Sequence, residues 1–261
     1  GQLPLRTEGR HEQHPLPDAD RVDVLDVVAV EGDGRRLDPG GDLREPLGDA
    51  LVVYTLDPKI GRTLSQSGIH FRLFGSEAHA KWANYGTPGF TKVMACKYVI
   101  ASEILNAGHN ALYIDSDIVF LRNPAEHLKT VSQASTSPLI MQVETPKDVY
   151  NTGFWFARPH PSVLALFESV QRSLIADKAF VCDQHCLNQL VLEQREISID
   201  RLDAELFACG NQFLRSDLLP TRAVKFLVDR SQRPFPFDDA YLLHFNFLVG
   251  RIRKLAAMKG H

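Results

Sequence analysis

An acidic pair enclosed by two apolar runs constrains this chain more than any other stretch. Residues 111–114 (ALYI) lead into Asp-Ser-Asp at 115–117, and 118–121 (IVFL) follow at once. A segment this apolar is typical of a buried strand covered on both faces. Two carboxylates at the end of such a strand are costly to bury unless something pairs with them.

In an extended backbone, side chains two residues apart point the same way, so Asp115 and Asp117 can offer oxygens to one divalent cation. Mg²⁺ and Mn²⁺ prefer such oxygen ligands, and the cation would hold the phosphates of a bound substrate. The alternative is that the two aspartates cap a turn that Asn123-Pro124 closes, because Asp is common in turns.

Strand and helix patterns alternate from residue 50 onward. Apolar or alternating runs predict strands at 50–55, 69–74, 138–143 and 151–157, with weaker strands at 197–199, 223–228 and 241–244. Apolar residues spaced by three and four predict helices at 90–106, 161–174, 183–192 and 247–258, and a helix or turn is expected from Pro58 through Leu64. This order predicts an α/β fold with a mixed, mostly parallel sheet and helices on both faces. Ligands of such sheets bind at the carboxyl ends of strands, where the acidic pair lies.

The first 48 residues differ from the rest of the chain. They are polar and rich in Gly, Pro and Asp, and only 22–30 (VDVLDVVAV) has the pattern of a strand. We therefore expect residues 1–48 to form an irregular arm or tail, and residues 49–261 to form a single domain.

Composition excludes some partners. The net charge of −3 gives no basic excess for nucleic acid or an anionic membrane. No apolar run approaches the roughly 20 residues of a membrane span, and no signal peptide is visible. The compartment stays open between the cytoplasm and the lumen of the Golgi, where the chain would be the trimmed domain of an anchored protein. The four cysteines match no zinc pattern, and we expect small core residues, with one disulfide as the alternative.

Four stretches in a fixed order carry a resemblance to a known family. They are Lys97 with its helix through Leu105 and Gly108; YIDSDIVFLRNP (113–124); NTGFWFARP (151–159) followed by DQHCLNQL (183–190); and HFNFLVGRIRK (244–254). With these stretches, about residues 50–258 resemble the nucleotide-diphospho-sugar transferase family of the GT-A (Rossmann-like) fold. The family includes plant rhamnogalacturonan xylosyltransferases, and glycogenin and bacterial lipopolysaccharide galactosyltransferases are more distant. Phe120 stands where plant members carry Trp, and the terminal block of glycogenin is absent, so donor and acceptor identities do not carry over.

The resemblance implies a metal site made by Asp115, Asp117 and His244, holding Mn²⁺ (or Mg²⁺) against the diphosphate of the donor. The alternative for His244 is a hydrogen-bonded core histidine. Gly250 would allow close approach to a phosphate, and Lys254 would neutralise the leaving diphosphate. The alternative for Lys254 is a solvated basic helix face.

The resemblance also implies residues that bind the donor. They are Thr55, Lys97, Asp115, Ser116, Asn151, Thr152, Gly153 and Gly250. The assignment of Thr55, like that of Asp57, is based mainly on topology, because such folds hold the nucleotide base and ribose at the end of the first strand. Lys97 could instead reach to the surface, and the Asn-Thr-Gly run could instead be a bulge in a sheet.

Asp183 and Gln184 are the pair that the resemblance places against the sugar. Asp183 would bond sugar hydroxyls, and Gln184 would face the anomeric carbon, although Asp183 could instead be an ordinary helix cap. An amide is a poor nucleophile, so a front-face reaction with retention is favoured, in which the leaving phosphate deprotonates the acceptor. An inverting enzyme would need a carboxylate base, for which only Asp148 and Asp203 are loosely placed.

The sequence thus predicts a metal-dependent glycosyltransferase that moves a sugar from a nucleotide diphosphate, expected to be UDP, to a saccharide or protein hydroxyl. Its expected partners are a nucleotide-sugar donor and a carbohydrate or glycoprotein acceptor, with no nucleic acid and no membrane span. Two alternatives remain. One is a catalytically silent GT-A domain that binds a sugar or partner, and the other is a nucleotidyltransferase or phosphohydrolase. The second expects a Gly-rich phosphate loop, whereas residues 55–63 contain one Gly.

Overall fold

A computed structural model describes eight ranges of the chain. They are residues 24–30, 51–55, 58–74, 88–144, 149–176, 182–194, 197–213 and 239–246. The predicted strand at 223–228 and the predicted helix at 247–258 lie outside these residues. Within the described ranges, none of the helices has both the length and the apolar character needed to cross a membrane.

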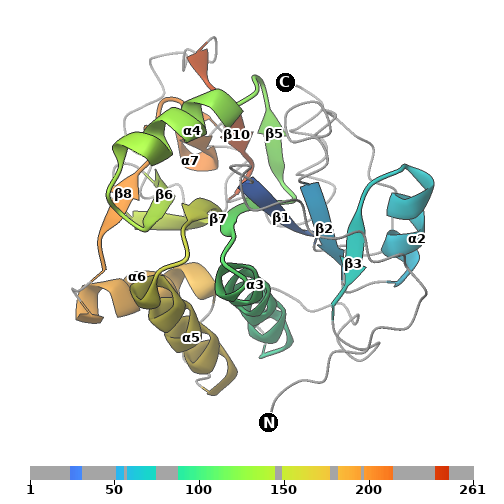
Figure 1. Cartoon of the computed structure of the whole chain (residues 1–261), viewed down its shortest axis with the longest axis horizontal. Coiled ribbons are helices and arrows are strands. Elements are labelled where there is room, and N and C mark those ends of the chain that lie inside the picture. Colours follow the sequence, from blue (N-terminus) through green and yellow to red (C-terminus); the bar gives the residue numbers. More distant parts are fainter. Residues whose placement is uncertain are drawn as a thin grey trace.

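A seven-stranded sheet forms the centre of the fold, in the order β3-β2-β1-β4-β7-β6-β8 (Figure 1). Its strands are β1 (Val24–Val30), β2 (Leu51–Thr55), β3 (Phe71–Leu73), β4 (Asn110–Asp115), β6 (Leu139–Glu144), β7 (Val149–Ala157) and β8 (Ile199–Arg201). Strand β7 runs antiparallel to both of its neighbours, and all other pairs in this sheet are parallel. The predicted α/β class with a mixed, mostly parallel sheet is therefore confirmed.

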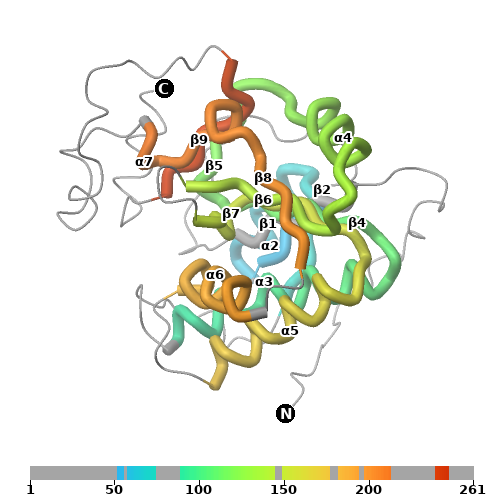
Figure 2. Tube along the Cα trace, turned by 90° about the vertical axis from the view of Figure 1, so that its left-hand side faces the viewer, coloured from blue at the N-terminus to red at the C-terminus, as the bar shows by residue number. Residues whose placement is uncertain are grey.

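Helices cover both faces of the sheet. They are α2 (Pro58–Gln66), α3 (Pro88–Asn106), α4 (Ala125–Ala134), α5 (Pro161–Ala176), α6 (Asp183–Gln194) and the short α7 (Gly210–Phe213). Helices α3, α5 and α6 lie together on one side of the sheet, and α4 lies on the other (Figures 1 and 2). Helix α3 ends as predicted at a glycine, because Gly108 adopts a left-handed φ of 87°.

The alternation of side chains along each strand explains the two apolar cores. On β4, Tyr113 packs into the core under α3, α5 and α6, whereas Leu112 and Ile114 pack into the core shared with α2 and α4. On β7, Trp155 and Phe154 divide in the same way. Burial on both faces is why these strands read as continuous apolar runs in the sequence.

A small second sheet lies beside the end of β4. It has the order β5-β10-β9, with β5 (Ile118–Phe120), β9 (Phe207–Cys209) and β10 (Leu242–His244). The apolar run that follows Asp117 forms β5, so the chain passes from the first sheet to the second at Asp115 and Asp117. Strand β10 pairs antiparallel with β5 and places His244 opposite Ile118. This pairing connects the acidic pair to a histidine that is distant in the sequence.

Some elements differ from the sequence-based expectation. Strand β1 confirms the strand pattern at 22–30, but it lies between β2 and β4 and so belongs to the central sheet instead of to an arm outside the domain. An apolar strand is stabilised inside the sheet because its backbone pairs with a strand on each side, here β2 and β4. Helix α4, strand β9 and the short α7 were not predicted. The cysteines at 96, 186 and 209 are buried, which confirms the expectation of core residues for these three, whereas Cys182 is partly exposed.

Candidate functional site

Three side chains converge where β4, β5 and β10 meet. His244 Nε2 lies 3.7 Å from Asp115 Oδ2 and 3.2 Å from Asp117 Oδ1. One ligand atom from each of the three residues lies within 4.8 Å of the others. His244 and Asp117 are buried, while the Asp115 side chain keeps 34% of its surface exposed. The group therefore opens on the Asp115 side.

The orientation of the His244 ring is set from behind. Its Nδ1 lies 2.9 Å from Gln142 Oε1, and the NH₂ of Gln142 donates to the Phe207 carbonyl at 3.0 Å. Because the Gln142 oxygen must accept, Nδ1 donates to it, and Nε2 faces the two aspartates. Nε2 can therefore offer its lone pair to a cation held between the three groups, or carry a proton that pairs with the carboxylates.

Gly153 on β7 leaves the room that this group occupies. A Cβ at this position would lie 2.3 Å from His244 Cε1, 2.4 Å from Asp115 Oδ2 and 2.9 Å from His244 Nε2. These are clashes, so only glycine allows the histidine and the aspartate to approach each other here. The Gly153 N–H donates to Asn151 Oδ1 at 2.8 Å. Gly153 thus lies against two of the candidate metal ligands, and its role in binding the donor stays a prediction.

The ligand set suits a divalent cation. Two carboxylate oxygens and one imidazole nitrogen match the donors that Mn²⁺ accepts, and Mg²⁺ accepts the imidazole less readily. The fixed ring and the Gly153 gap are features that a core histidine does not require. Asp115 also accepts a bond from Tyr113 Oη at 2.8 Å, which holds one of its oxygens away from His244.

Burial raises the pKa of the Asp115 carboxyl above its usual value, and the ammonium of Lys97 partly opposes this shift. Lys97 does not reach the surface but is 3% exposed inside the protein. Its Nζ donates to the Thr152 carbonyl at 3.0 Å, forms an ion pair with Asp183, and lies 4.9 Å from the centre of the Tyr113 ring. The ammonium group of Lys97 therefore lies between the Asp115 side of the site and the Asp183 side.

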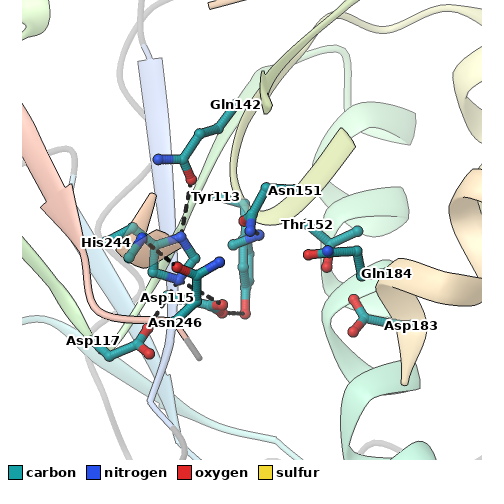
Figure 3. A network of polar contacts seen from close by, with 12 residues as sticks. Tyr113, Asp115, Asp117, Gln142, Asn151, Thr152, Asp183, Gln184, His244 and Asn246 are labelled. Atoms are coloured by element: carbon teal, nitrogen blue, oxygen red, sulfur yellow. Dashed lines mark hydrogen bonds and ion pairs between the residues drawn. The ribbon is translucent and has the colours of Figure 1, made fainter. Parts of the chain in front are cut away.

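Asp183 is the first residue of α6, and its carboxylate points into the protein. It accepts a bond from Tyr98 Oη at 2.9 Å in addition to the Lys97 pair. Burial raises the pKa of Tyr98, and the negative charge of Asp183 adds to the shift. Figure 3 shows Asp183 and Gln184 across Tyr113 and Asn151 from the group of Asp115, Asp117 and His244.

A carboxylate that the sequence analysis missed lies between the two sides. Glu144 at the end of β6 is 7% exposed, and its Oε1 accepts bonds from the side-chain amides of Asn151, Gln184 and Asn246. A signal was available, because polar residues at 142 and 144 alternate with apolar ones at the end of the predicted strand 138–143.

The other predicted residues are placed as follows. Thr55 is buried at the carboxyl end of β2, two strands away from Asp115 at the same edge of the sheet. Ser116 is exposed in the turn between β4 and β5. Gly250, Lys254, Asp57 and Asp148 lie outside the described residues. Asp203 is exposed, and its carboxylate accepts the N–H of Glu205 at 2.8 Å, so it is engaged in a local turn.

The arrangement places a candidate metal-binding group of two aspartates and one histidine at the carboxyl edge of the central sheet. The model of the family described as nucleotide-diphospho-sugar transferase matches residues 47–258, and the chain belongs to this family.

Two curated relatives come from Arabidopsis thaliana. Arabinosyltransferase XEG113 is 27% identical over 182 residues, which cover 65% of this chain and 28% of that protein. Beta-arabinofuranosyltransferase RAY1 is 25% identical over 201 residues, covering 68% of this chain and 35% of that protein. The chain thus spans about a third or less of the length of these relatives. A solved structure of a glycosyltransferase involved in glycosylation of the major capsid of PBCV-1 overlaps 90% of this chain and 99% of its own, with 14% identity and a TM-score of 0.49.

Proposed function

We propose that the chain is a retaining, metal-dependent glycosyltransferase that uses a UDP-sugar and transfers the sugar to a saccharide or protein hydroxyl. The observation that carries this proposal is the convergence of Asp115, Asp117 and His244, with His244 Nε2 facing both carboxylates and Nδ1 held by Gln142. Asp115, Asp117 and His244 would hold Mn²⁺ or Mg²⁺. A cation bound there supplies electrostatic stabilisation of the departing diphosphate.

The residues of the chain supply binding and orientation. Lys97 forms an ion pair with the Asp183 carboxylate and fixes its position, so that it can accept hydrogen bonds from sugar hydroxyls. Thr55 lies where the fold would hold the base or ribose, and Asn151 and Thr152 border the sugar. Gly250 and Lys254 stay candidates for the diphosphate.

The carboxylates on the sugar side support retention by a front-face reaction. Asp183 is engaged by Lys97 and Tyr98, and Glu144 is engaged by three amides, so neither is placed as a free base or nucleophile among the described residues. The bond from the anomeric carbon to the diphosphate oxygen breaks, and its electron pair leaves with the diphosphate. The acceptor oxygen forms the new bond on the same face, and its proton passes to the departing diphosphate oxygen.

The sugar that we propose first is a pentose, because both curated relatives are named as arabinosyltransferases. Hexoses stay in the test as alternatives. Both types of donor share the UDP diphosphate, which the metal group would recognise irrespective of the sugar.

The test is a screen of UDP-sugars, including UDP-arabinofuranose, for Mn²⁺-dependent hydrolysis, with NMR of the anomer first released. Calorimetry with UDP, with and without Mn²⁺, measures the metal site directly. We expect UDP to bind only with Mn²⁺, and Asp117→Asn to abolish this binding. Glu168→Gln is the control, because the Glu168 side chain is 65% exposed on α5. UDP affinity that is independent of the metal contradicts the metal site, and no UDP binding in the presence of Mn²⁺ supports the catalytically silent alternative, which binds no metal-nucleotide.

A further inference from the structure

Glu144 has an unusual set of partners for a buried carboxylate. Its Oε1 accepts the NH₂ groups of Asn151 at 2.9 Å, Gln184 at 3.0 Å and Asn246 at 2.9 Å. These amides come from three parts of the chain: strand β7, the first turn of α6 and the segment after β10. One oxygen therefore ties together elements that surround the candidate site.

An ionised carboxylate can only accept hydrogen bonds, so it determines which end of each amide faces it. The NH₂ must point toward Glu144 and the carbonyl oxygen must point elsewhere. In two of the amides that oxygen has its own donor: Asn151 Oδ1 accepts the N–H of Gly153, and Asn246 Oδ1 accepts the N–H of Gly210. These two amides would keep their orientation without Glu144.

Gln184 is different. Among the described residues, no donor bonds its side-chain oxygen, so Glu144 alone determines which way the amide is turned. Figure 3 shows the Gln184 side chain beside Asp183 and Thr152, on the side of the site opposite the metal group. The carbonyl end carries partial negative charge, and the NH₂ end carries partial positive charge.

Sugar transfer of the kind proposed above builds positive charge at the anomeric carbon as the diphosphate departs. A carbonyl oxygen near that carbon stabilises the transition state, and an NH₂ in its place destabilises it. We propose that Glu144 is a positioning residue, which turns the Gln184 amide so that its oxygen and not its NH₂ faces the reacting sugar. This inference rests on the proposed function.

Strand β6 contributes two residues that orient side chains of the candidate site. Gln142, two residues earlier on the same strand, orients His244, and Glu144 orients Gln184. Loss of Gln142 should therefore weaken metal binding, whereas loss of Glu144 should slow turnover at saturating metal and donor. Variants of two residues on β6 thus distinguish an effect on metal binding from an effect on turnover.

The experiment is a double-mutant cycle with Glu144→Ala, Gln184→Ala and the combined variant, measured at saturating Mn²⁺ with the best UDP-sugar from the screen. We expect Glu144→Ala to lower kcat on the order of 10- to 100-fold with little change in donor KM. In the Gln184→Ala background the same change should cost no more than about 3-fold, because the residue it acts through is gone. Glu193→Ala is the matched control, because it removes an exposed bond of the same kind, from Gln189 Nε2 at 3.0 Å, on the same helix.

Glu144→Gln keeps an oxygen acceptor of the same size, so it should recover part of the lost kcat, and it carries the same cycle if the alanine variant does not fold. Equal losses of kcat with and without Gln184 would overturn the proposal, since a merely structural role acts in both backgrounds. An unchanged kcat in Glu144→Ala would also overturn it.

A readout that needs no turnover separates this inference from the proposed function. In ¹⁵N-labelled protein, the side-chain NH₂ signals of Gln184 should be dispersed in the wild type and collapse toward free-amide positions in Glu144→Ala. If no UDP-sugar is turned over, the proposed function fails, and these signals decide about Glu144. Unchanged signals refute the orientation by Glu144, and collapsed signals support it.

Discussion

Gly153 offers the sharpest test of the metal group, because a single methyl group decides the outcome. In Gly153→Ala the new Cβ would lie 2.3 Å from His244 Cε1 and 2.4 Å from Asp115 Oδ2. Relief of these contacts to van der Waals distance needs a displacement of about 1 Å, and a shift of this size at a site can cost about 100-fold. Metal-ligand distances tolerate only about 0.2 Å, so the two ligands cannot absorb it.

We therefore expect Gly153→Ala to weaken Mn²⁺-dependent UDP binding on the order of 100-fold, measured by calorimetry. Crowding of a packed interior also lowers the free energy of unfolding, by about 1–3 kcal/mol, measured by urea denaturation. The far-UV circular dichroism spectrum should stay unchanged, because the strand itself is not interrupted.

Gly61→Ala is the matched control for crowding. A Cβ at Gly61 would lie 2.6 Å from Phe71 Cε2, in the packing between α2 and β3 and not at the metal group. This variant should change stability without changing UDP affinity. If Gly153→Ala binds Mn²⁺ and UDP within about 3-fold of the wild type, then His244 and Asp115 need not lie as close as the structure has them for metal binding.

Three further predictions concern other buried groups. Lys97→Met leaves the Asp183 carboxylate buried without its cation and should lower the free energy of unfolding by about 3–5 kcal/mol. Adding Asp183→Asn should restore much of this loss. Urea denaturation measures both variants, and equal stabilities of the single and the double variant would contradict the pairing. Burial raises the pKa of Cys96 to about 11, so the folded state keeps this proton while the unfolded chain loses it from about pH 9. The free energy of unfolding should therefore fall by about 1.4 kcal/mol per pH unit between these two pH values. Denaturation at pH 8 and pH 10 should show a smaller fall in Cys96→Ala than in the wild type. Gln142→Leu should weaken Mn²⁺ binding about 10- to 100-fold and leave kcat recoverable at high Mn²⁺, whereas a kcat that stays low at saturating metal would show that Gln142 acts beyond His244.

The sequence by itself determined the class of fold and one half of the site. The strands 110–115, 139–144 and 149–157 and the helices at 88–106 and 161–176 follow from apolar period and length, which are local properties. Asp115 and Asp117 could be paired on one side of the chain from their spacing alone. His244 was within reach only because its surrounding residues resemble a family pattern.

Tertiary structure decided what no local pattern contains. The place of β1 between β2 and β4 depends on which neighbours have open hydrogen-bonding edges. The burial of Lys97 beside Asp183, and the convergence of three amides on Glu144, join residues up to 102 positions apart. A side chain's partners depend on the packing of whole elements, so a polar residue near the end of a strand has no assignable role until the fold shows what faces it.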